Sequence, residues 1–412
     1  MAARSRCVVL GAGVGGHFAV EALRKAGFDG AVTLVGAEGV RPYDRPPLSK
    51  AFLQGAKGAD DLFFRPPEFY RDLDVELLPA APAETVDVAG RRLRLADGDE
   101  IPYDALLIVT GASPIRLRLP GFDLPGVHYL RSLADGEALR ADLDRAERVL
   151  VVGAGFIGSE VAACARVLGR AVTLVDLLEA PMVGALGDEL GRLYAGLHRS
   201  HGVELRMGSG VVELRGQGRV EEAVLAGGER VACDLVVVGV GVRPETRVVA
   251  GTPVAVGRGI LVDEYGATSV PGIYAAGDVA EWVHPGLGVR LLVEHFDNAG
   301  MQAAAAARAI AGQPEPYAPV PSFWSDQYDT TLQYYGYPLR WDAVVLRGEP
   351  ESPSVTAFYL AEGRVTGAAM LNRPREHRPA RRLVAARAAI DPAVLADPAT
   401  DLRALSRQFQ GE

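Results

Sequence analysis

Two copies of one glycine-rich turn constrain this chain more than any other feature. Each copy has the spacing G-x-G-x-x-G directly after a short apolar run, and the glycines are Gly11, Gly13 and Gly16 in the first copy and Gly153, Gly155 and Gly158 in the second. The first glycine makes a tight turn, the second lets backbone approach a pyrophosphate, and the third lets a helix pack on a strand. A single such motif can be purely structural. Here a second apolar run follows each copy, at 31–35 and 171–176, so the sequence predicts two β-α-β nucleotide-binding folds.

The second strand of such a fold should end in an acid that binds ribose hydroxyls. Asp176 occupies this position in the second fold, and neither residue 177 nor residue 178 is basic. A 2′-phosphate would meet only negative charge there, so the sequence predicts NADH rather than NADPH. In the first fold the strand ends at Gly36, and we expect Glu38, two residues later, to take the ribose contact.

Composition and charge exclude several other classes of function. The formal net charge of the 412 residues is −9, which gives no electrostatic footprint for nucleic acid. No apolar stretch approaches the ~18 residues that a membrane-spanning helix needs, and the first strand begins too early to leave room for a signal peptide. The three cysteines, Cys7, Cys164 and Cys233, are too far apart to suggest a metal site or a dithiol centre. We therefore expect a cytoplasmic protein without a metal.

Lysine is rare in this chain, which draws attention to Lys50 at the end of a rigid proline-rich loop, 41–50. Glu160 lies just after the second glycine turn, where an unpaired acid would repel phosphates. We expect the two side chains to form a pair. The alternative is that Lys50 is an ordinary exposed lysine.

Three other features have two interpretations each. Asp278 follows an apolar strand in a Gly-Asp turn, where its carboxylate would either bind the ribityl hydroxyls of a flavin or cap a helix. Trp324 is either a ring that covers a cofactor or a core aromatic residue at a domain junction. The arginine-rich stretch 373–387 is either a solvated face or a docking surface for an acidic partner.

Taken together, these motifs resemble the NADH-dependent ferredoxin reductases of bacterial oxygenase systems. The resemblance covers essentially the whole chain. Besides the glycine turns it rests on the segments 45–50, 109–113, 272–278, 293–298, 323–328, 372–375 and 381–383. The chain departs from the family pattern at Phe296, where tryptophan is common, and at Ala37, where an acid is common.

The resemblance implies an α/β fold class with two Rossmann-like dinucleotide-binding domains, arranged as in glutathione reductase, and an α+β C-terminal domain. An FAD-binding domain is expected in 1–113 and 243–325, interrupted by an NAD-binding domain in 114–242. The C-terminal domain is expected in 326–412. Its alternating pattern predicts strands at 331–335, 343–347, 355–360 and 365–371.

The resemblance also implies the residues of the site. Lys50, Glu160 and Trp324 are the expected catalytic residues, with Trp324 beside the flavin ring. Glu160 and Glu294 are expected near the nicotinamide. The residues expected to bind FAD are Gly11, Gly13, Gly15, Gly16, Glu38, Arg45, Lys50, Ala83, Arg131, Asp278 and Phe296. The residues expected to bind NADH are Gly153, Gly155, Ile157, Gly158, Glu160, Asp176, Gly241 and Glu294.

The implied reaction passes electrons from NADH to FAD and then singly to an external carrier. Nicotinamide gives up a hydride, whereas iron-sulfur proteins accept one electron at a time, and a flavin can do both. The expected carrier is a [2Fe-2S] ferredoxin that docks near Arg373, Arg375, Arg378, Arg381 and Arg382. Three alternatives stay open: a rubredoxin reductase, a reductase of quinones or oxygen, and an NADH-sensing flavoprotein similar to apoptosis-inducing factor.

Overall fold

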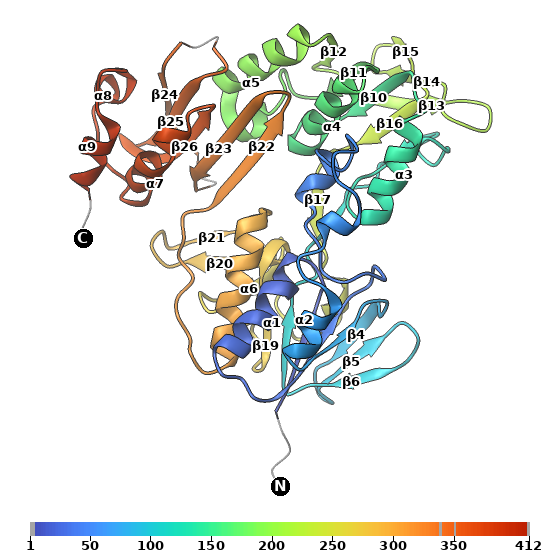
Figure 1. The fold of residues 1–412 in the computed structure, drawn as a ribbon, viewed down its shortest axis with the longest axis vertical. Coiled ribbons are helices and arrows are strands. Elements are labelled where there is room, and N and C mark those ends of the chain that lie inside the picture. The colour runs from blue at the N-terminus through green and yellow to red at the C-terminus, as the bar shows by residue number, and fades with distance from the viewer. Residues whose placement is uncertain (1–4, 338–339, 350–351, 410–412) are drawn as a thin grey trace. The chain divides into compact units, whose positions relative to one another are not determined.

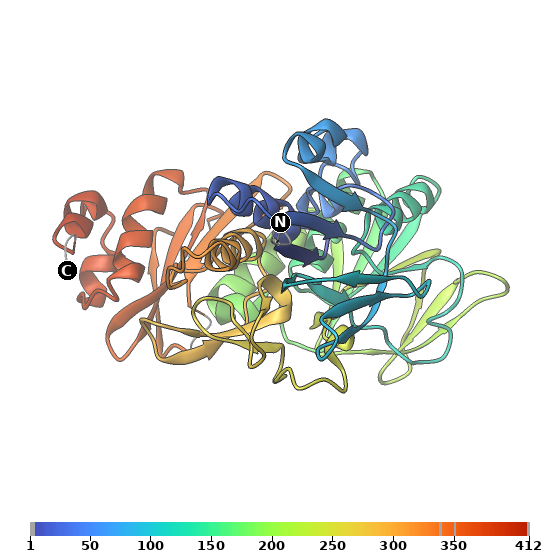
Figure 2. The ribbon, with the colours of Figure 1, turned by 90° about the horizontal axis from the view of Figure 1, so that it is seen from below.

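The computed structural model of the chain describes residues 5–337, 340–349 and 352–409. The chain divides into two compact units, whose elements are drawn in Figures 1 and 2. The first unit consists of Met1–Asp44, Asp60–Ser113 and Arg243–Pro321, and the second of Arg45–Ala59, Pro114–Val242 and Ser322–Glu412. Each unit is therefore assembled from three separate stretches of sequence.

A five-stranded parallel sheet forms the centre of the first unit. In spatial order its strands are β19 (Ile273–Ala275), β7 (Ala105–Ile108), β1 (Arg6–Leu10), β2 (Ala31–Val35) and β3 (Val75–Leu78). The strands are short and largely apolar, as is usual for parallel sheets that are covered on both faces. The register pairs Leu10 with Val35 and with Ile108, so the first glycine turn begins at the edge where these strands end.

Two helices, α1 (Val14–Lys25) and α6 (Phe296–Ile310), lie side by side in the first unit (Figures 1 and 2). They share one core with the sheet, to which Leu23, Leu34 and Ala303 contribute buried side chains. The smaller elements of this unit are η2 (Asp60–Leu62), α2 (Pro67–Asp72), β4 (Ala83–Asp87), β5 (Arg92–Leu95), β6 (Glu100–Pro102), η3 (Arg247–Val249), β18 (Ile260–Val262), η4 (Gly277–Val279), β20 (Ala280–His284) and β21 (Val289–Leu291). The short strands β8 (Ala112–Pro114) and β17 (Val242–Pro244) lie where the chain passes from one unit to the other.

The second unit contains another five-stranded parallel sheet. In spatial order its strands are β12 (Val203–Met207), β11 (Ala171–Asp176), β10 (Arg148–Val152), β16 (Leu235–Val238) and β9 (Val127–His128). The elements around it are η1 (Pro46–Ser49), α3 (Leu133–Leu143), α4 (Phe156–Val167), α5 (Val183–Ser200), β13 (Val211–Arg215), β14 (Glu222–Leu225) and β15 (Arg230–Ala232). The register pairs Val152 with Val175 and with Val238. The second glycine turn and Asp176 therefore lie at the same edge of this sheet.

An antiparallel sheet from the end of the chain completes the second unit. In spatial order it contains β22 (Ser322–Gln327), β23 (Thr330–Gly336), β26 (Arg364–Leu371), β25 (Val355–Ala361) and β24 (Ala343–Arg347). It is followed by η5 (Pro374–Glu376), α7 (His377–Ala385), α8 (Pro392–Ala396) and α9 (Leu402–Arg407). The side chains of β25 are buried on both faces, and α5 covers one of these faces. Helix α7 packs against β23 and β26 (Figure 1).

The architecture confirms the expected fold class, with two parallel dinucleotide-binding sheets and an α+β C-terminal part. The four strands expected between 331 and 371 are all present, with ends within one residue of the expected ones. The predicted boundary between residues 325 and 326 falls inside β22, and residues 45–59 group with the second unit. The domain limits themselves stay a prediction.

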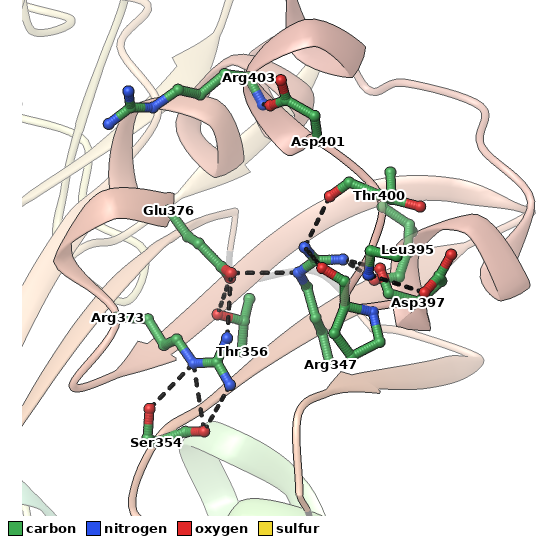
Figure 3. Close-up of polar contacts among 12 residues, drawn as sticks. Arg347, Ser354, Thr356, Arg373, Glu376, Leu395, Asp397, Thr400, Asp401 and Arg403 are labelled. Carbon is green, nitrogen blue, oxygen red and sulfur yellow. Dashed lines mark hydrogen bonds and ion pairs between the residues drawn. The ribbon is translucent and has the colours of Figure 1, made fainter.

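One buried arginine anchors the last helices to the C-terminal sheet (Figure 3). Arg347 ends β24 and donates to four backbone carbonyl oxygens, those of Leu395, Asp397, Pro398 and Thr400. Its Nε lies 3.2 Å from Oε1 of Glu376, and the hydroxyl of Thr356 donates to the other oxygen of that carboxylate at 2.6 Å. The guanidinium thus supplies donors to four carbonyl oxygens of the segment 395–400.

We predict that Arg347→Met destabilises the protein by about 1–3 kcal/mol, because it leaves carbonyl oxygens of residues 395–400 without their buried donor, whereas Glu376 keeps Arg373 as a partner. Calorimetric unfolding should show this as a lower Tm. Arg375→Met, which removes an exposed arginine next to Glu376 in the sequence, is the control and should leave the Tm nearly unchanged. Equal Tm values for the two variants would contradict the anchoring role.

Candidate functional site

The first glycine of each turn has a backbone conformation that L side chains rarely adopt. The φ angle is +124° at Gly11 and +100° at Gly153, in a region that favours glycine. A Cβ on the third glycine of either turn, Gly16 or Gly158, would overlap the carbonyl oxygen of the first. The spacing of the motif is therefore enforced by backbone contacts at both ends of each turn.

Each turn leads into a helix whose first N–H groups receive no side-chain cap from the residues that the structure describes. The N-cap residues are Gly13 for α1 and Gly155 for α4, and neither first turn contains an acid. A Cβ on Gly155 would meet no described atom within 4 Å, so the space before α4 is open. Unbonded N–H groups, the positive end of the helix dipole and open space fit a bound diphosphate. The second turn therefore fits the pyrophosphate of a dinucleotide, and the first turn shares its glycine spacing and its helix without a side-chain cap.

Asp176 ends β11 beside the second turn. Its Oδ2 accepts a hydrogen bond from the N–H of Ala154 at 2.5 Å, and its Oδ1 accepts one from the N–H of Leu178 at 2.8 Å. These bonds hold the carboxylate where the ribose of a dinucleotide on α4 would lie. The side chain of Leu177 is exposed and offers no positive charge for a 2′-phosphate. The ribose contact itself stays a prediction.

The expected pair of Lys50 and Glu160 is present in the second unit. Nζ of Lys50 lies 2.7 Å from Oε2 of Glu160, and the two side chains are 17% and 2% exposed. Burial raises the pKa of Glu160, and the charge of Lys50 and three hydrogen bonds oppose this effect. Because an unpaired carboxylate at this depth would take up a proton, the lysine stabilises the negative charge. Paired and desolvated groups of this kind are typical of functional sites.

Glu160 lies on a face of α4 that contacts two distant segments. Phe156, Glu160 and Cys164 are spaced four residues apart and share this face. The hydroxyl of Ser49 donates to Oε2 of Glu160 at 2.5 Å, and the thiol of Cys164 donates to the carbonyl oxygen of Ser49 at 3.1 Å. From β22, the hydroxyl of Ser325 donates to Oε1 of Glu160 at 2.7 Å.

Sequence reasoning missed Ser49 and Ser325 as neighbours of Glu160. They are 111 and 165 positions away from it in the chain, so no local pattern links them. The one signal available was that each serine belongs to a segment on which the family resemblance rests, 45–50 or 323–328.

Trp324 lies on β22, where successive side chains point to opposite faces. The ring of Phe323 is 4.6 Å from that of Phe156, and Ser325 contacts Glu160, so this face of the strand packs against α4. Trp324 lies on the other face and is partly buried. Its place beside a flavin stays a prediction.

Two of the residues expected to bind FAD meet in the second unit. Nη1 of Arg45 donates to the carbonyl oxygen of Arg131 at 2.7 Å. The contact connects the proline loop to the residue before the N-cap of α3, Ser132. The side chain of Ser132 and that of Asp135 form a capping box at this helix, which fixes the local backbone.

Several residues expected to bind FAD belong to the first unit. Asp278 lies inside η4, whose N-cap is Ala276, so it does not cap this helix from the N-cap position. Glu38 is exposed and accepts a hydrogen bond from the hydroxyl of Tyr43 at 2.6 Å. The FAD contacts of Asp278 and Glu38 stay predictions.

The remaining expected site residues have simple structural positions. Gly15 is buried in α1, Ala83 begins β4, Glu294 is exposed before α6, Phe296 begins α6, Ile157 is exposed in the first turn of α4, and Gly241 has φ +106°. Glu294 belongs to the first unit and Glu160 to the second. Their shared contact with nicotinamide stays a prediction.

The cysteines are free and buried at three separate places. Burial raises the pKa of each thiol, Cys7, Cys164 and Cys233, to about 12. A thiol with so high a pKa is a poor nucleophile near neutral pH because the thiolate is the reactive form. These cysteines are therefore unsuited to thiol chemistry.

The arginine stretch is not uniformly exposed. Arg373 donates to the backbone oxygen of Ser354 at 2.9 Å and pairs with Glu376 at 3.3 Å (Figure 3). The arginines that the structure leaves exposed are Arg375, Arg378, Arg381 and Arg382. Arg373 therefore has a structural partner that the sequence did not reveal.

Among residues 5–337, 340–349 and 352–409, no helix has the length and apolar character to cross a membrane. In the same described residues, no group of three or more histidine, cysteine or acidic side chains is arranged to hold a metal ion.

Comparison with known proteins assigns a family to nearly the whole chain. Residues 5–309 match the family model of pyridine nucleotide-disulphide oxidoreductases, and residues 322–406 match the model described as reductase C-terminal.

Individual relatives extend over the same length. A ferredoxin–NAD(P)(+) reductase from a Sphingomonas species is 39% identical to this chain, covering 96% of each protein. Rhodocoxin reductase from Rhodococcus erythropolis is 38% identical and covers 96% of this chain and 93% of its own. Among solved structures, putidaredoxin reductase in its covalent complex with putidaredoxin is similar with a TM-score of 0.96 and 31% identity over 100% of both chains.

The ion pair predicts a pH-dependent stability. A carboxyl whose pKa is raised by folding contributes stability at low pH, and this is lost as the pH rises from the unfolded value near 4.5 through the folded one. Lys50→Met removes a charge that lowers the pKa of Glu160. We therefore expect the Tm of this variant to fall more steeply than that of the wild type as the pH rises above 4.5.

Two further variants make this measurement specific. Lys57→Met removes an exposed lysine from the same stretch of chain and should keep the wild-type profile. Adding Glu160→Gln to Lys50→Met should abolish the extra slope because the titrating group is gone. If the Tm of Lys50→Met and that of Lys57→Met change with pH in the same way, this account of the pair is refuted.

Proposed function

Because this chain belongs to the pyridine nucleotide-disulphide oxidoreductase family, as one of its ferredoxin reductases, we propose that it passes electrons from NADH through FAD to a [2Fe-2S] ferredoxin. Each NADH gives up one hydride, which is two electrons and one proton. Two ferredoxins take one electron each, and the proton goes to solvent. The free buried thiols support a cytoplasmic location, since reducing compartments keep thiols free.

The observation that carries this proposal is the presence of two separate places that suit a dinucleotide. Each is a glycine turn at the end of a parallel sheet, followed by a helix with open N–H groups. One site suits the tightly held FAD, and the other suits NADH. Asp176, at the second site, supports NADH rather than NADPH. The relatives named for ferredoxin and rhodocoxin reduction support the choice of an external electron carrier.

FAD, when bound, accepts the hydride from nicotinamide and releases electrons one at a time. The chain's own residues bind and orient the two cofactors. The α1 and α4 N-termini would hold the pyrophosphates, and Asp278 and Lys50 would contact the flavin. The Lys50–Glu160 pair places one fixed positive and one fixed negative charge in a buried setting, where they act strongly on any charge that develops nearby.

The proposed ferredoxin site is the exposed part of the arginine stretch. Arg375, Arg378, Arg381 and Arg382 are exposed within one short segment. Small ferredoxins are typically acidic, so this surface would attract them electrostatically. Arg373 contributes less, because its guanidinium is already bound to Ser354 and Glu376.

The proposal is tested by mixing the FAD-loaded protein with NADH and a [2Fe-2S] ferredoxin. We expect flavin bleaching on addition of NADH alone, followed by stoichiometric reduction of two ferredoxins per NADH. A flavin that is reduced by NADH but transfers electrons only to oxygen or quinones would contradict the assignment.

Coenzyme choice should follow the charge at the end of β11. We predict that Asp176→Ser combined with Leu177→Arg lowers the NADH to NADPH ratio of kcat/KM by about 10- to 100-fold, because one charged hydrogen bond contributes about 1.5–3 kcal/mol. Asp176→Ser alone should lower kcat/KM for NADH without raising kcat/KM for NADPH. A wild-type protein that uses both coenzymes equally well would contradict the role of Asp176.

Ferredoxin docking should depend on the exposed arginines and on salt. We predict that Arg375→Glu with Arg378→Glu raises the KM for ferredoxin by about tenfold, because electrostatic steering acts mainly on association. The rate of flavin reduction by NADH should be unchanged. The wild-type ferredoxin reaction should slow as salt shortens the Debye length below about 8 Å.

Arg230→Glu is the matched control, since this exposed arginine lies on β15 in a different sheet. It should not change the ferredoxin KM. If the double variant behaves like this control at every salt concentration, the arginine surface is only solvated and the ferredoxin binds elsewhere.

A further inference from the structure

A row of buried polar side chains leads away from Glu160 into the second unit. The hydroxyl of Ser325 donates to Oε1 of Glu160 at 2.7 Å, and Nε2 of Gln327 donates to Oγ of Ser325 at 3.3 Å. Ser325 and Gln327 are two residues apart on β22 and therefore share a face. Both are buried. Polar side chains at this depth need partners, because an unmade hydrogen bond is costly there.

Gln327 has a second buried polar neighbour, His198 on α5, whose side chain is fully buried. Its Nδ1 lies 3.1 Å from the hydroxyl of Tyr328. Its Nε2 and Oε1 of Gln327 are both buried and have no hydrogen-bond partner among the described residues. Gln327 is nevertheless the neighbour that raises the pKa of His198, against a larger lowering by burial to about 4. His198 is therefore neutral near pH 7, with one ring N–H.

The donors along this row point in one direction. When the hydroxyl of Tyr328 donates to Nδ1 of His198, the ring hydrogen is on Nε2. Gln327 is a neighbour of this ring, and its side-chain oxygen has no partner among the described residues. The amide of Gln327 then donates to Ser325, and Ser325 donates to Glu160. If Nε2 of His198 donates to the side-chain oxygen of Gln327, then His198, Gln327 and Ser325 each accept on one side and donate on the other, and the row ends on a carboxylate.

The other groups near Glu160 do not donate a hydrogen bond to its Oε1. Lys50 and Ser49 donate to Oε2, the opposite oxygen. The thiol of Cys164 donates to the backbone of Ser49. The hydroxyl of Tyr194 is buried and has no hydrogen-bond partner within the described part of the chain. Ser325 is thus the donor to Oε1 that the described contacts provide.

We propose that Tyr328, His198, Gln327 and Ser325 form a donor row that keeps Glu160 deprotonated and oriented toward Lys50. These four are positioning residues, which act on the reaction through the Lys50–Glu160 pair. Hydrogen bonds in series polarise one another, so the row strengthens its last donor. The inference rests on the proposed function, in which that pair serves the two cofactors.

The direct test is pH-difference infrared spectroscopy of the FAD-loaded, oxidised protein, which reads the carboxyl band of Glu160 without turnover. Glu160→Gln identifies the band by removing it. We expect Ser325→Ala to raise the proton affinity of Glu160 by about tenfold, as the loss of one hydrogen bond to a charged group implies. Ser325→Thr, which keeps a hydroxyl, should restore the wild-type titration.

Tyr328→Phe tests the far end of the row. It removes only the hydroxyl that sets the orientation of His198, and we expect a smaller shift in the same direction. Tyr194→Phe is the matched control, because it removes a buried hydroxyl from α5 that has no described partner. Titration of Glu160 at the wild-type pH in both Ser325→Ala and Tyr328→Phe would overturn the proposal. If Ser325→Ala does not fold, the comparison of Tyr328→Phe with Tyr194→Phe decides it.

The infrared result is independent of the ferredoxin reaction. A shifted titration in a protein that fails to reduce ferredoxin would reject the proposed function and retain the donor row. Normal ferredoxin reduction with an unshifted titration would reject the donor row and retain the proposed function.

Discussion

The ion pair of Lys50 with Glu160 is the contact on which the rest of the proposed site depends. A carboxylate that is 2% exposed needs donors on both oxygens, and the chain supplies them from two distant segments, 45–50 and β22. Residues 45–50, α4 and β22 are thereby held against one another within the second unit. The pair thus fixes local structure and places charge at the same time. Glu160 lies in the second turn of α4, where the paired lysine stabilises its negative charge.

The two parallel sheets provide the second constraint. Strands in register end at a common edge, as Leu10 does with Val35 and Val152 with Val175. Glycine turns and ribose-binding acids that follow such strands therefore meet at one place. This geometry makes the proposed dinucleotide sites a consequence of strand register, whereas the Lys50–Glu160 pair depends on side chains from distant parts of the chain.

The sequence predicted the features that repeat or that follow local periodicity. The two turns, the strand ends and the C-terminal strands depend on contacts between near neighbours, and the structure has them. The pair of Lys50 and Glu160 could be anticipated because an unpaired acid just after the second glycine turn would repel a bound phosphate. The roles of Ser49 and Ser325 could not, because they depend on tertiary packing across more than a hundred residues. Arg373 looked like a free surface charge for the same reason, since its partner Ser354 is visible only in the fold.

A crystal structure of the protein with FAD and NAD⁺ bound tests the central claim most directly. The account predicts the FAD pyrophosphate at the N-terminus of α1 and the NAD⁺ pyrophosphate at the N-terminus of α4. It further predicts a ribose of NAD⁺ on Asp176 and the nicotinamide close to the Lys50–Glu160 pair. A structure in which either turn is empty while its dinucleotide binds elsewhere, or in which the nicotinamide lies away from Glu160, would contradict it.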